Sequence, residues 1–132
     1  MDVNKELLEE KIREYRTFLS CSESTLMGLC ESVEYPIEKS EMVKLGIGFA
    51  GGIGGTFDEG TCGALTGALI ANGLVVDDPT IIKANANELY NSFKEEYNSV
   101  CCGKITNNGE DKSLCVDCCV FIADKLVDLW QK

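Results

Sequence analysis

Apolar residues recur at helical spacing along most of the chain, and this periodicity constrains the fold more than any other feature. In residues 5–19, Leu8, Ile12, Tyr15 and Leu19 fall among Glu, Lys and Arg, as in an amphipathic helix. No segment shows the sustained alternation of a strand, and the one strand candidate, residues 74–76, is too short to found a sheet. Because 132 residues supply one core, we predict a single all-α domain, 1–132, a compact bundle of about five or six helices with a glycine-rich loop.

Capping signals and turn residues divide this bundle into segments. The run Ser20-Cys21-Ser22-Glu23 has the S-x-x-E form of a capping box, which predicts a second helix through about residue 33. Asp78-Pro79 is a typical N-cap and first-turn proline. Gly, Asn and Asp between residues 103 and 112 indicate a loop. The remaining helices are expected at 37–49, from Thr61-Cys62 to Asn72-Gly73, from 79 to about 97, and at 114–130.

Glycine is concentrated between residues 46 and 55. Gly46, Gly48 and Gly51 spell G-x-G-x-x-G, but that dinucleotide fingerprint requires a preceding strand, whereas here a helix precedes it. Two interpretations stay open. The glycines permit a tight turn and close helix contacts, or their N–H groups form a nest for an anionic centre. In the second case the candidate cofactor-binding residues are Gly51, Gly52, Gly54 and Gly55.

Composition excludes several classes of function. Asp plus Glu number 22 against 12 Lys plus Arg, a formal net charge of −10, so nucleic acid is an unfavourable partner. The chain contains no histidine, which removes Ser-His and Cys-His catalysis. The longest apolar run, residues 63–76, is too short to span a bilayer. Residues 1–7 lack the features of a secretory signal, which predicts a cytoplasmic protein.

Eight cysteines are the feature to explain, at positions 21, 30, 62, 101, 102, 115, 118 and 119. Cys21, Cys62 and Cys115 fall in predicted first helical turns, where the positive helix end is expected to lower a thiol pKa. Cys115 and Cys118 form a C-x-x-C, a spacing that serves metal ligation or a redox disulfide. Four thiolates could hold zinc or an iron–sulfur cluster. Free cysteine is also a good small core residue.

The order of these motifs resembles a known family. The residues that carry the resemblance are, in order, Cys21, the glycine run 48–55, the Cys62-Gly63-Ala64-x-x-Gly67 element, Cys102 and Cys115. From about residue 20 to 130, the chain is similar to the bacterial proteins named for their C_GCAxxG_C_C motif. The family has four characteristic cysteines and is thought to be redox-active or to bind a prosthetic group such as an iron–sulfur centre. The resemblance implies that the metal ligands are Cys21, Cys62, Cys102 and Cys115, with Cys101, Cys118 and Cys119 as redox alternates.

Three hypotheses follow. The first is a protein that binds a metal or iron–sulfur centre through these cysteines, transfers electrons or assists a redox process, and docks a redox partner protein or oxidoreductase. The second is a metal-free dithiol/disulfide protein in which Cys62 or Cys115 is the low-pKa thiolate. The third is a zinc-stapled helical interaction domain. No acid/base pair indicates a substrate, so the sequence does not decide whether the protein is an enzyme. It does not decide the oligomeric state either, and a homodimer is among the possibilities. A shared site requires Cys62, Cys102 and Cys115 to converge.

Overall fold

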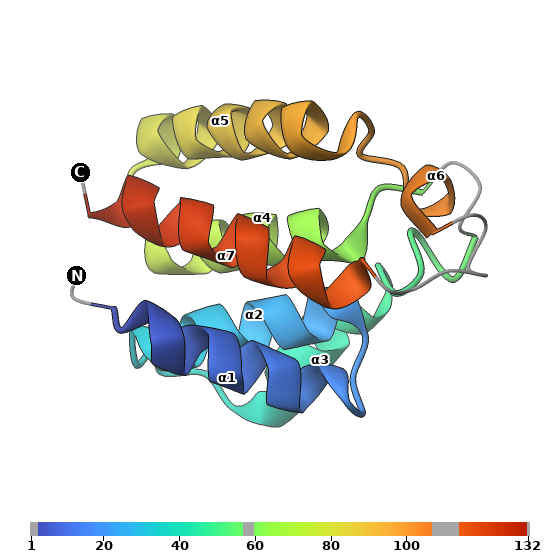
Figure 1. Cartoon of the computed structure of the whole chain (residues 1–132). Coiled ribbons are helices and arrows are strands. Elements are labelled where there is room, and N and C mark those ends of the chain that lie inside the picture. The colour runs from blue at the N-terminus through green and yellow to red at the C-terminus, as the bar shows by residue number, and fades with distance from the viewer. Residues whose placement is uncertain (1–2, 57–59, 107–113, 132) are drawn as a thin grey trace.

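The computed structural model describes residues 3–56, 60–106 and 114–131, and over these ranges it contains seven α-helices and no strand (Figure 1). The prediction of an all-α fold is therefore confirmed. The helices are α1 (Lys5–Arg16), α2 (Cys21–Ser32), α3 (Lys39–Ile47), α4 (Gly63–Val75), α5 (Pro79–Tyr97), α6 (Cys102–Thr106) and α7 (Cys115–Trp130).

The helices form three layers. In Figure 1, α5 lies on one side, α7 and α4 lie in the middle, and α1, α2 and α3 lie on the other side, with both chain ends at one end of the bundle and α6 at the opposite end. Helix α4 packs against α2, α5 and α7. The core between them is apolar, as the amphipathic pattern predicts, and its fully buried side chains include Leu8, Ile12, Leu26, Leu29, Leu65, Leu89, Phe93, Ile122 and Leu126.

Two predicted helix starts are confirmed by their caps. The Glu23 carboxylate accepts a hydrogen bond from the backbone N–H of Ser20 at 3.3 Å, which is the reciprocal half of a capping box. The Asp78 carboxylate accepts from the backbone N–H of Thr80 at 2.9 Å, and Pro79 occupies the first turn of α5. The sequence signals at these two starts are therefore satisfied by local hydrogen bonds.

Predicted boundaries differ from the structure by up to three residues at α1 and α3, and two predictions of local structure are wrong. Helix α4 continues past Asn72 to Val75, so residues 74 and 75 are helical and the strand candidate is wrong. The reason is that Asn72 is fully buried and its amide donates to the Ile82 carbonyl at 3.0 Å instead of capping α4. The predicted loop is also wrong for residues 103–106, which belong to the short helix α6. Residues 107–112 lie outside the described ranges.

Close packing of α4 on α2 depends on missing side chains. A Cβ atom on Gly67 would lie 2.4 Å from the Ser22 carbonyl oxygen, and one on Gly63 would lie 3.0 Å from the Ser22 backbone nitrogen. No other residue type fits at Gly67 without a shift of one helix. The two glycines thereby bring the start of α2, with Cys21, beside the start of α4, with Cys62.

A short backbone pairing brings a third cysteine to the same place. An isolated antiparallel bridge pairs Thr61 with Cys101. On either side of it, the Cys62 N–H donates to the Val100 carbonyl at 2.6 Å, and the Cys102 N–H donates to the Gly60 carbonyl at 2.7 Å. Segments about 40 residues apart in sequence are thus joined next to their thiols. Within the described ranges, no helix has the length and apolar character needed to cross a membrane.

Candidate functional site: a cavity lined by five cysteines

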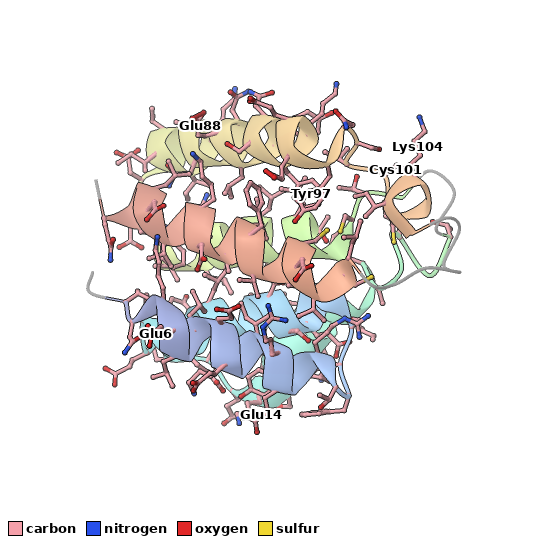
Figure 2. All side chains as sticks on the ribbon, viewed as in Figure 1. Glu6, Glu14, Glu88, Tyr97, Cys101 and Lys104 are labelled. Carbon is pink, nitrogen blue, oxygen red and sulfur yellow. The ribbon has the colours of Figure 1, made fainter. Side chains whose placement is uncertain are left out.

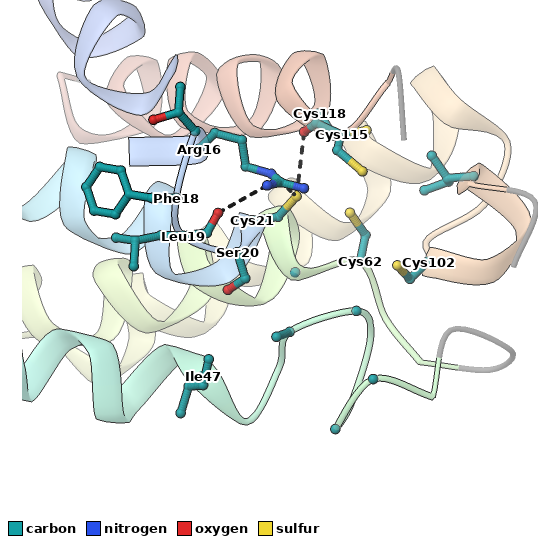
Figure 3. Close-up of a pocket in the computed structure, with 17 residues that line it drawn as sticks. Arg16, Phe18, Leu19, Ser20, Cys21, Ile47, Cys62, Cys102, Cys115 and Cys118 are labelled. Carbon is teal, nitrogen blue, oxygen red and sulfur yellow. Dashed lines mark hydrogen bonds between the residues drawn. The ribbon is translucent and has the colours of Figure 1, made fainter. Parts of the chain in front are cut away.

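A cavity of about 550 Å³ opens where the helix starts meet (Figure 3). Its wall carries five thiols, from Cys21, Cys62, Cys102, Cys115 and Cys118. Much of the remaining cavity wall is apolar and is formed by the side chains of Phe18, Leu19, Ile47 and Ile105. The volume falls within the range of small-ligand and cofactor sites.

The four cysteines expected from the sequence share one structural position. Cys21, Cys102 and Cys115 are the first residues of α2, α6 and α7, and Cys62 is the N-cap of α4. The start of α6 was missed, because glycine and asparagine nearby indicate a loop. The positive ends of the three long helices α2, α4 and α7 therefore face the cavity, an arrangement that favours negative charge there.

The remaining cysteines lie behind this wall or away from it. The Cys119 thiol is fully buried and donates to the Cys21 carbonyl at 3.7 Å. Cys101 is half-buried in the bridge with Thr61. Cys30 is fully buried on α2 and belongs to the apolar core, where burial raises its pKa to about 12. None of these three residues borders the cavity.

The cavity thiols contact one another in pairs. Cys62 shares a side-chain hydrogen bond with Cys118, and Cys21 shares one with Cys115. The Cys21 thiol also approaches the Cys115 carbonyl oxygen at 3.8 Å (Figure 3). The Tyr97 hydroxyl, which points between α5 and α7 in Figure 2, bonds to Cys118 from the other side. Each pair joins a helix start on one side of the cavity to the first turn of α7.

Contact and burial raise the pKa of these thiols. Hydrogen bonding to Cys118 and burial raise the pKa of Cys62, and hydrogen bonding to Cys21 and burial raise that of Cys115. For Cys21 the largest influence, the bond with Cys115, lowers the pKa, but the bond with Cys119 and burial together outweigh it. The predicted lowering of these pKa values is therefore wrong, because neighbouring thiols and desolvation outweigh the helix ends.

One charged residue of the site was missed in the sequence. Arg16, the last residue of α1, is the only charged side chain among the described residues that line the cavity. Its Nε–H donates to the Cys21 sulfur at 3.2 Å, and its Nη1 donates to the Leu19 carbonyl at 3.1 Å. It also hydrogen-bonds to Cys115. The available signal was a basic residue at the end of the first helix, a few residues before the helix start that carries Cys21.

The glycine loop borders the cavity, but two of its N–H groups are already used. Gly51, Gly54 and Gly55 line the cavity, whereas Gly52 packs behind it; a Cβ there would lie 3.0 Å from the Gly60 Cα. All four have positive φ, between 58° and 93°. The N–H groups of Gly54 and Gly55 donate to the carbonyls of Gly48 and Ala50, both at 2.8 Å. The loop therefore closes on itself at these two positions and does not present them as a nest.

The donor chemistry of the wall fits a soft metal centre. Thiolates are the ligands of iron–sulfur clusters and of all-sulfur zinc sites, and the wall supplies five cysteines and no carboxylate. Among the described residues, however, no three Cys, Asp or Glu side chains are already grouped as a metal site. A bound centre would therefore have to draw sulfurs from different helix starts together.

Comparison with known proteins identifies the family. No curated protein and no solved structure matches the chain. The family model described as "Putative redox-active protein (C_GCAxxG_C_C)" matches residues 19–129. The match covers Cys21, the glycine loop, Cys62, Cys102 and Cys115. With most of its length in this match, the chain belongs to the C_GCAxxG_C_C family.

Proposed function

We propose that the cavity holds a thiolate-ligated redox centre of the iron–sulfur type and that the protein passes electrons to and from a redox partner protein. The supporting observation is that Cys21, Cys62, Cys102 and Cys115, which come from four separate segments, border one cavity. Core packing alone gives no reason for four thiols at helix starts to meet. Cys30 illustrates the structural alternative, because it is buried among apolar side chains away from the cavity.

The residues of the chain have separate tasks in this proposal. The four cysteines hold the centre, which when bound supplies one-electron chemistry. Gly63 and Gly67 keep the starts of α2 and α4 close together. Metal binding would replace the thiol protons, so the raised pKa values of Cys62 and Cys115 predict that loading weakens as the pH falls. Apolar side chains of Phe18, Ile47 and Ile105 line the cavity beside the cysteines.

Anaerobic reconstitution with ferrous iron and sulfide tests this proposal. We expect a visible charge-transfer spectrum and stoichiometric iron and sulfide in the wild-type protein. The variants Cys62→Ala and Cys102→Ala should lose this centre, while Cys30→Ala should keep it, because Cys30 lies outside the cavity. Equal loading of all three variants, or a folded wild-type protein that takes up no iron, would refute the proposal. Stoichiometric zinc whose removal unfolds the protein would instead indicate a structural metal site.

A second candidate function is supported by the paired thiols. Contact between Cys62 and Cys118, and between Cys21 and Cys115, suits reversible disulfide formation without metal. Each disulfide would release two protons and pass two electrons to an acceptor such as a disulfide of low molecular weight. The raised pKa values of these thiols slow such exchange, which is why this function ranks second.

Thiol counting separates the two functions. In metal-free protein treated with oxidised glutathione, the second function predicts loss of thiols in twos and mass-spectrometric cross-links between residues 62 and 118 or 21 and 115. Cys118→Ala should abolish the first cross-link and leave the second. Unchanged thiols at the potential of the cytosolic glutathione pool would exclude this function.

A further inference from the structure

We propose that Arg16 is a positioning residue that sets the reduction potential of the cavity centre through its contacts with the sulfurs of Cys21 and Cys115. This inference rests on the proposed function, since it assigns a role beside the same sulfurs. It adds a residue that lies outside the family match, which begins at residue 19. Arg16 belongs to α1, which ends just before the matched region.

The geometry around Arg16 singles it out. Its guanidinium reaches both Cys21, at 3.2 Å from Nε, and Cys115. The bond from Nη1 to the Leu19 carbonyl, at 3.1 Å, fixes the plane of the guanidinium (Figure 3). A planar fork with several donors can bridge two sulfurs while anchored to a carbonyl, which the single ammonium of lysine cannot do in the same way.

The charge distribution explains why this contact matters. No carboxylate lines the cavity, so among the described residues Arg16 supplies its only formal charge. Its side chain is partly buried, where charge interactions are less screened than at the surface. A redox centre becomes more negative when it gains an electron. A cation and hydrogen bonds at its sulfurs therefore stabilise the reduced form and raise the reduction potential.

Helix α1 is held against the helix that carries Cys115. Lys5 pairs with Asp128 of α7. Leu8 and Ile12 of α1 are fully buried in the core. These contacts keep the end of α1, and with it Arg16, in place beside the first turn of α7.

Potentiometry of the reconstituted protein tests the role of Arg16. In Arg16→Gln we expect the midpoint potential to shift to a more negative value, and in Arg16→Lys we expect a smaller shift in the same direction. Arg13→Gln is the matched control, because Arg13 lies on the same helix, pairs with Glu9 at 2.9 Å and does not border the cavity. Its potential should equal that of the wild type. Equal potentials for Arg16→Gln and Arg13→Gln, with both proteins folded by circular dichroism, would overturn the proposal.

A second readout needs no metal. In the metal-free protein, alkylation of Cys21 by iodoacetamide, followed by peptide mass spectrometry, should be roughly three- to tenfold slower in Arg16→Gln than in Arg13→Gln, because a neighbouring cation increases the negative charge available at sulfur. If the wild type takes up no iron but this difference is found, the proposed function fails and the contact role of Arg16 stands. If the rates are equal, the assignment of Arg16 itself is wrong.

Discussion

At the scale of single residues, glycine decides how closely two thiol-bearing helix starts approach. Gly67 faces the Ser22 carbonyl oxygen at a distance that leaves no room for a methyl group. Gly73, on the same helix, has no packing neighbour within 4 Å of the position its Cβ would occupy. Gly67 is therefore needed for packing on α2, whereas Gly73 has no packing partner.

Substitution of these glycines tests this difference. Gly67→Ala should lower the free energy of unfolding by about 1–3 kcal/mol, the usual cost of overpacking, because α2 and α4 must separate. Gly73→Ala should leave it unchanged or raise it by up to about 1 kcal/mol, since alanine is the better helix former. Urea denaturation followed by circular dichroism measures both. A Gly67→Ala protein as stable as the wild type would contradict the close contact at Ser22.

The cysteines show how far residue patterns predict a site. Cys21, Cys62 and Cys115 fall at the starts of helices predicted from the sequence, and all three border the cavity. Arg16 and the contact of Cys118 with Cys62 could not be predicted in the same way. They depend on how α1 and α7 pack across the site, and a single sequence carries no signal for the rotation of one helix against another.

At the scale of helices, one buried amide links three of them. Asn72 of α4 donates to the Ile82 carbonyl of α5 at 3.0 Å, and its Oδ1 accepts from Asn85 Nδ2 at 3.1 Å and from Trp130 Nε1 of α7 at 3.2 Å. Both the nitrogen and the oxygen of the Asn72 amide are therefore hydrogen-bonded, as a buried polar side chain requires. The Asn-Gly pair in the sequence indicates a helix end. This prediction fails because local sequence preferences do not include hydrogen bonds to residues on other helices.

Removal of this amide should cost more than the loss of a surface bond. Asn72→Ala leaves the buried Asn85 amide and Trp130 indole without their acceptor, and we expect the free energy of unfolding to fall by about 2–4 kcal/mol. Asn91→Ala is the matched control, because Asn91 on exposed α5 surface donates only to Asn87 at 3.1 Å. Its effect should stay below about 0.5 kcal/mol. Similar losses in both variants would show that the network contributes little.

At the scale of the whole molecule, negative charge exceeds positive charge on an all-helical surface. The formal net charge is −10, and residues such as Glu14 and Glu88 lie on the outer faces of the bundle (Figure 2). The ion pairs that oppose this repulsion, Lys5–Asp128 and Arg13–Glu9 among them, are largely exposed, and pairs of this kind are worth about 0–1 kcal/mol each. Repulsion among the excess carboxylates should therefore outweigh the attraction within these pairs.

Salt should consequently stabilise the folded protein. An increase of sodium chloride from about 0.01 M to 0.5 M shortens the Debye length from about 30 Å to less than 8 Å, which screens the long-range repulsion more than the short ion pairs. We expect the melting temperature at pH 7 to rise by a few degrees. The double variant Glu14→Gln/Glu88→Gln removes two negative charges and should show a higher melting temperature at low salt and a smaller response to sodium chloride. A melting temperature that falls as salt is added would mean that the surface ion pairs, and not the net charge, dominate the electrostatics of folding.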